Sequence, residues 1–94
     1  MGIEYSLRFT APDSQSIEEL VLQRLWSARP ATPPQPGIEL WLGTAEEKYP
    51  QATLQTEPGG LYFCDYCGGH GRALLGELVA LLVSMFGPVT VDEL

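Results

Sequence analysis

The sequence predicts an α+β fold, a two-layer sandwich in which an antiparallel or mixed sheet of four or five strands carries two helices on one face. Two patterns support this prediction. Several short segments alternate apolar and polar residues, which is the period of a strand buried on one side. Two longer segments repeat apolar residues at helical spacing between the strands, so the arrangement is expected to be close to the ferredoxin-like, split βαβ type.

The first predicted element is an N-terminal strand with one buried and one solvated face. Its alternating apolar side chains are Ile3, Tyr5, Leu7 and Phe9. A helix follows, because Ser16 and Glu19 fit a capping box and apolar residues then recur at helical spacing. Arg29 and Pro30 are predicted to end this helix.

Shorter elements are predicted in the middle of the chain. Residues 30–37 contain four prolines and indicate an extended, exposed connection. Residues 38–42 predict a short strand, and residues 44–49 predict a single helical turn.

A hairpin, a second helix and a last strand complete the predicted fold. The hairpin joins residues 52–56 to 61–66 through Pro58 and two glycines, which provide a fixed φ and access to positive φ. The helix at 72–86 is apolar over roughly 200° of its circumference, and a strand follows at 89–92. Because so small a chain offers little core to cover this helix, a homodimer that hides the remainder is expected.

Size and composition indicate one domain. Ninety-four residues, 45% of them hydrophobic, can bury one modest core, so we expect a single α+β domain over residues 1–94 without a separate catalytic module. The first ten residues show no basic segment followed by an apolar one, so no secretory signal is predicted. The expected location is the cytoplasm, where both cysteines stay reduced.

The charge balance favours a protein partner. Twelve acidic residues against five basic ones give a formal net charge of −7. Nucleic acids and anionic membrane surfaces repel such a chain, so neither is expected as a partner. A basic protein is the better electrostatic match.

One cluster gathers both cysteines and the only histidine: Cys64, Cys67 and His70. The string from Cys64 to Gly71 follows the pattern CxxCxGxG and resembles one zinc-binding repeat of the DnaJ cysteine-rich region. The resemblance implies Cys64 and Cys67 as zinc ligands. That family pairs two repeats per zinc and this chain has one, so its chaperone function is not implied.

Three interpretations of the cluster stay open. Structural zinc takes four ligands and the cluster offers at most three, so a metal site needs a ligand from elsewhere or a second chain. A thiol-redox role needs the thiols close to a helix N-terminus, and residues 68–71 are predicted to separate them from the helix. We favour the third interpretation, in which Cys64 packs as a small hydrophobe, Cys67 ends the strand and the glycines form the turn. No cofactor is expected.

The outward face of the predicted sheet is the candidate binding surface. Strand alternation places Glu4 and Gln55 there, together with either Tyr62, Cys64 and Tyr66 or Phe63 and Asp65. Aromatic and acidic side chains together suit a protein partner. The predicted protein-binding residues are Trp41, Glu39, Glu57, Arg8 and Tyr62.

The sequence thus predicts a small, acidic, non-catalytic protein-interaction module. No nucleophile, base and orienting group are grouped in the pattern, so an enzyme is not expected. In size and acidity the chain is similar to immunity or antitoxin-type inhibitors of basic toxins, and a homodimeric subunit is a second form of the same hypothesis. The alternative is a zinc or thiol-redox protein centred on Cys64, Cys67 and His70.

Overall fold

The computed structural model describes residues 2–11, 14–31, 36–41, 49–66 and 69–94, with the backbone alone at 14–16 and 69–70. Its elements in chain order are β1 (Ile3–Arg8), α1 (Ser14–Arg24), β2 (Ala28–Pro30), β3 (Ile38–Leu40), β4 (Ala52–Glu57), β5 (Gly60–Asp65), α2 (Gly69–Phe86) and β6 (Thr90–Glu93). The helical turn predicted at 44–49 lies almost wholly outside the described residues.

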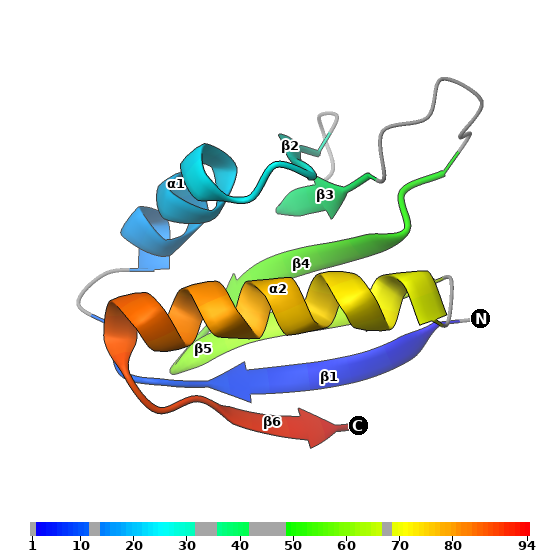
Figure 1. Ribbon diagram of the computed structural model, residues 1–94. Coiled ribbons are helices and arrows are strands. Elements are labelled where there is room, and N and C mark those ends of the chain that lie inside the picture. Colours follow the sequence, from blue (N-terminus) through cyan, green and yellow to red (C-terminus); the bar gives the residue numbers. More distant parts are fainter. Residues whose placement is uncertain (1, 12–13, 32–35, 42–48, 67–68) are drawn as a thin grey trace.

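The described strands form one open sheet in the order β2-β3-β4-β5-β1-β6, and every neighbouring pair is antiparallel (Figure 1). The four strands from β2 to β5 follow one another as a meander. The N-terminal β1 then lies beside β5, and the C-terminal β6 lies beside β1. Consequently α1 carries the chain from β1 across the sheet to β2, and α2 carries it from β5 over β1 to β6.

The number of strands corrects the prediction of four or five, because the described sheet has six. The unexpected strand is β2, which lies where a helix end and a proline-rich connection were predicted. It pairs with β3 from Ala28 opposite Leu40 to Pro30 opposite Ile38. Proline cannot donate to a β-ladder, but at the edge of a sheet it loses no bond, so Pro30 is compatible with this position.

One face of the sheet packs against both helices. Cross-strand neighbours on this face include Tyr5 opposite Phe63 and Leu54 opposite Phe63, and all three are buried. The helices add the buried side chains Ile17, Val21, Leu25, Leu74, Leu75, Leu78 and Leu82 to the same core cluster. The prediction of an α+β fold with both helices on a single face is therefore confirmed for the described residues.

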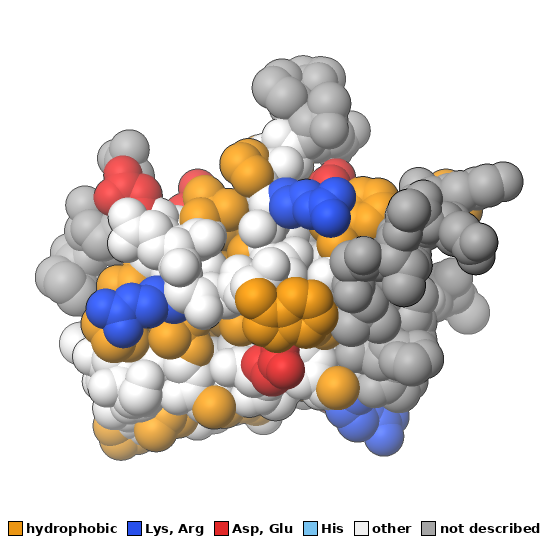
Figure 2. Space-filling model, turned by 45° about the horizontal axis from the view of Figure 1, so that its top comes forward, with side chains coloured by type: hydrophobic (Ala, Val, Ile, Leu, Met, Phe, Trp, Pro, Cys, Tyr) orange, Lys and Arg blue, Asp and Glu red, His pale blue; other side chains and the backbone are white. Residues whose placement is uncertain are grey.

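The wide apolar surface of α2 is largely used inside the chain. Besides its buried leucines, Val79, Leu81 and Phe86 pack against the core. Val83 and Met85 stay 46% and 39% exposed. On the side of the molecule seen in Figure 2, hydrophobic side chains form separate patches among polar and charged ones. The homodimer stays a prediction, and most residues that motivated it already have partners within the chain.

No helix among the described residues combines the length and hydrophobicity needed to cross a membrane.

The turn between β4 and β5 follows the prediction. Glu57 lies opposite Gly60, with Pro58 and Gly59 between them. Gly59 has φ of 82°, which with proline before it fits a type II turn. The chain reverses there without strain, and β5 continues directly toward α2.

The helix α2 begins at Gly69, three residues before the predicted start at Arg72. The reason lies at Asp65, which is buried at the end of β5. A Cβ added at Gly71 would lie 1.7 Å from Asp65 Oδ1 and 2.9 Å from Oδ2, so the carboxylate lies directly against the first turn of the helix. The positive end of the helix dipole favours a carboxylate there. Gly71 thus allows this contact and belongs to the helix instead of to a turn.

We expect Gly71→Ala to destabilise the protein. The new methyl group would overlap a short, buried carboxylate, and such overpacking costs about 1–3 kcal/mol. The better helix propensity of alanine, about 1 kcal/mol, offsets only part of this cost. Chemical denaturation of parent and variant measures the difference in the free energy of unfolding.

Gly76→Ala is the matched control in the same helix. A Cβ at Gly76 meets no atom within 4 Å, so this variant should gain about 0.5–1 kcal/mol from helix propensity alone. Equal effects of the two substitutions would contradict the proposed contact between Asp65 and Gly71.

Candidate protein-binding face

The face of the sheet turned away from the helices, called the outer face below, is covered by no described helix. Its described side chains are Glu4, Ser6, Arg8, Arg29, Glu39, Thr53, Gln55, Glu57, Tyr62, Cys64, Thr90 and Asp92. Tyr66 follows on the same side. The structure thereby decides between the two sets left open by the sequence, because Phe63 and Asp65 are buried on the core side.

Cross-strand hydrogen bonds pair the carboxylates of the outer face with donors. Tyr62 Oη donates to Glu4 Oε1. Ser6 Oγ donates to Glu57 Oε1 at 2.8 Å. Arg8 forms an ion pair with Asp92 on the edge strand β6. Three predicted binding residues, Arg8, Glu57 and Tyr62, therefore lie on the expected face but already have partners within the chain.

The predicted contact Trp41 is also held by its neighbours. Its Nε1 donates to Glu39 Oε1 at 3.1 Å, and its backbone N–H donates to the Ser27 carbonyl at 2.8 Å. The guanidinium carbon of Arg29, on β2, lies 5.1 Å from the centre of the indole ring. Trp41 is half-buried as a result, and it forms part of a fixed group with Glu39 and Arg29.

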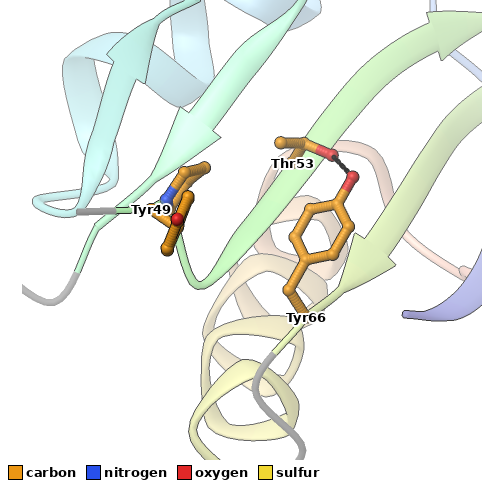
Figure 3. Close-up of a pocket in the computed structure, with 4 residues that line it drawn as sticks. Tyr49, Thr53 and Tyr66 are labelled. Atoms are coloured by element: carbon orange, nitrogen blue, oxygen red, sulfur yellow. Dashed lines mark hydrogen bonds between the residues drawn. The ribbon is translucent and has the colours of Figure 1, made fainter. Parts of the chain in front are cut away.

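A hollow of about 370 Å³ lies at the beginning of β4 (Figure 3). Its described lining consists of Tyr49, Pro50, Thr53 and Tyr66. The two tyrosines are 76% and 49% exposed. Tyr66 reaches across to β4, where its hydroxyl lies 3.3 Å from Thr53 Oγ1, within hydrogen-bond distance.

A second hollow of about 200 Å³ adjoins the first. The two share Thr53 and Tyr66, so we call them together the trough. The remaining described residues of the second hollow are Ala31, Pro36, Ile38, Glu39 and Gln55. Of the predicted binding residues, only Glu39 lines the trough.

Sequence reasoning missed Tyr49 and Pro50, and it placed Tyr66 on the outward face only in one of two alternative sets and not among the predicted binding residues. Tyr49 and Pro50 lie outside any regular element, and Tyr66 follows the end of β5. The signal that could have found them is a tyrosine-proline pair directly before a predicted strand, since exposed aromatic residues in connections are typical of binding surfaces.

The structure describes only part of the cysteine and histidine cluster. Cys64 is a free, buried thiol on the outer face, and a Cβ added at Gly2 would lie 2.5 Å from its Sγ. Cys67 and the side chain of His70 lie outside the described residues. Among the side chains that are described, no group of three His, Cys, Asp or Glu could hold a metal ion. The zinc and redox interpretations are therefore not tested.

The Tyr62 phenol is the clearest electrostatic feature of the outer face. Its hydrogen bond to Glu4 raises the pKa of Tyr62 well above its usual range, and desolvation and the neighbouring Cys64 act in the same direction. The phenol is held as a donor because its ionisation would place a second negative charge beside Glu4.

Comparisons with models of protein families, with curated proteins and with solved structures find no match to this chain. Its function must therefore be argued from its own residues.

We expect Tyr62→Phe to lower the stability at neutral pH by at most about 1 kcal/mol, the worth of an ordinary hydrogen bond. Because folding raises the pKa of Tyr62, its contribution is complete below the unfolded value of about 10 and is lost as pH rises above it. The parent should therefore lose more stability than the variant above about pH 10. Denaturation at neutral and alkaline pH measures both effects.

Tyr49→Phe serves as the control, since its hydroxyl belongs to a largely exposed side chain. It should leave the neutral-pH stability unchanged. The same alkaline loss in parent and Tyr62→Phe would contradict the role given to the bond with Glu4.

Proposed function

We propose that this chain is a small, acidic, non-catalytic protein-interaction module whose outer face binds a basic protein, with the cytoplasm as its location. One observation carries the proposal: the outer face, covered by no described helix, combines exposed aromatic side chains with carboxylates held in fixed positions. Glu4, Glu39 and Glu57 each accept a hydrogen bond from a neighbouring side chain.

The internal hydrogen bonds support binding of a basic partner. A carboxylate has two oxygens and about four acceptor sites, so one internal bond leaves capacity for a lysine or arginine. Side chains already ordered lose little conformational entropy when they bind. The net charge of −7 adds long-range attraction. An inhibitor of a basic toxin, of the immunity or antitoxin type, is one protein that fits this description.

The strand order supports a finer description of the fold. Without the hairpin β2-β3, the remaining order is β6-β1-β5-β4, and each helix joins two parallel strands across one that lies between them. We include in the proposal that the chain is a ferredoxin-like, split βαβ sheet with this hairpin added after α1.

The charge dependence of association tests the proposal, using a partner identified by affinity capture and then purified. The double variant Glu39→Gln with Glu57→Gln removes two charges and keeps side-chain acceptors for Trp41 and Ser6. Association should become several-fold slower, and added salt should slow the parent more than the variant. Dissociation should change little. Stopped-flow or surface-based kinetics give both rates.

The charge-matched control is Glu19→Gln with Glu77→Gln, which removes two exposed carboxylates from the helices. If the control slows association as much as the outer-face variant, net charge acts without any preference for the outer face and the proposal is wrong.

The zinc alternative has its own test. We expect protein purified without chelator to retain no stoichiometric zinc through dialysis, and Cys64→Ser with Cys67→Ser to leave the metal content unchanged. Native mass spectrometry reports metal content and subunit number together. Zinc that is retained by the parent and lost by the double variant would replace the proposed function with the metal-binding one.

A further inference from the structure

The trough has two chemically different ends. Tyr49, Pro50 and Tyr66 give one end flat, apolar surfaces, and Glu39 and Gln55 give the other end a carboxylate and an amide. Thr53 and Tyr66 belong to both hollows and so lie where the two ends meet. A ligand that fills the whole trough must therefore be extended, with an apolar group at one end and a donor or cation at the other.

The aromatic end suits proline rings. Tyrosine faces and proline form the grooves that recognise polyproline II segments, in which backbone ordering costs little because the conformation is already populated before binding. Tyr66 is held by Thr53 and is thus ordered before binding. The larger hollow, about 370 Å³, is in the size range of small-ligand sites.

The acidic end suits a basic side chain. Glu39 Oε1 accepts from the Trp41 indole, which fixes the carboxylate in place while its capacity for further donors remains. The guanidinium group of Arg29 lies over the ring of Trp41, the residue that donates to Glu39. With a chain charge of −7, a lysine or arginine of a ligand is attracted to this end, whereas a nucleic acid that could stack on the tyrosines is repelled.

We propose that the trough binds an extended, proline-containing segment of a partner protein that carries an arginine or lysine beside its prolines. The inference rests on the proposed function and names the part of the outer face and the chemistry of the partner. The prolines lie against Tyr49 and Tyr66, and the basic side chain lies at Glu39.

Titration of the full chain with a synthetic Arg-Pro-Pro-Ala-Pro-Pro-Arg peptide tests this inference. Backbone amide shifts in NMR spectra should concentrate at Thr53, Gln55 and Tyr66. Two further peptides serve as probes, one with every proline replaced by alanine and one with both arginines replaced by glutamate. Each should bind at least about tenfold more weakly, a difference of about 1.4 kcal/mol.

Variants of the chain locate the two ends of the ligand. Tyr66→Ala or Tyr49→Ala should weaken the parent peptide about tenfold, and Glu39→Gln should weaken it several-fold and reduce its dependence on salt. Trp26→Ala is the control, because Trp26 is an exposed aromatic residue outside the trough. It should leave the affinity unchanged, and circular dichroism confirms that each variant is folded.

The outcomes separate this inference from the proposed function. The trough assignment is wrong if the alanine-substituted peptide binds as tightly as the parent peptide. It is also wrong if the peptide causes the same backbone amide shifts in the Tyr49→Ala and Tyr66→Ala variants as in the parent protein. The same holds if no peptide binds while a protein partner still depends on Glu39 and Glu57. If association of the protein partner does not depend on Glu39 and Glu57 while the peptide still binds tightly, the proposed electrostatic binding by the outer face is wrong instead.

Discussion

The pairing of β1 with β5 is the interaction on which the rest of the structure depends. It joins the N-terminal strand to the end of the hairpin, with Ile3 opposite Asp65 and Arg8 opposite Gly60. Side chains alternate between the two faces of a strand, so a shift of one residue would exchange core and surface along the whole strand. A Cβ at Gly60 would lie 1.8 Å from the Leu7 carbonyl oxygen, which shows how closely the backbones approach at this end.

The same register determines the chemistry of the outer face. Ser6 lies opposite Tyr62, and Glu4 lies opposite Cys64, so donors and carboxylates of the two strands become neighbours. The resulting hydrogen bonds limit repulsion among acidic side chains and hold them in place. A face that is ordered before binding has less entropy to lose, which is an advantage for recognition without catalysis.

The trough follows from the neighbouring pair of strands. Because β4 and β5 are antiparallel, the residues just before β4 lie beside those just after β5. The Tyr66 N–H donates to the Gln51 carbonyl at 2.9 Å and extends this pairing by one step. Tyr49 and Tyr66, seventeen positions apart by their numbers, thus line the same hollow, although neither lies in a strand.

The sequence by itself determined which residues of β1 and α2 face inward and outward, whereas for β5 it left two sets open. Alternation along β1 and the helical spacing in α2 are local properties, and a local period is sufficient to predict burial. Pro30, Gly69 and Gly71 were misleading for the same reason. They indicate breaks locally, whereas strand pairing at the edge retains β2 and the buried Asp65 favours an earlier start of α2.

Only the tertiary structure decided which outward residues pair with one another and which line an open site. Trp41, Glu57 and Arg8 are outward as predicted, but their partners Arg29, Ser6 and Asp92 come from other strands. Such partners depend on the register between segments distant in the chain, and a local pattern carries no information about that register. The tyrosines of the trough are brought together by the same long-range pairing.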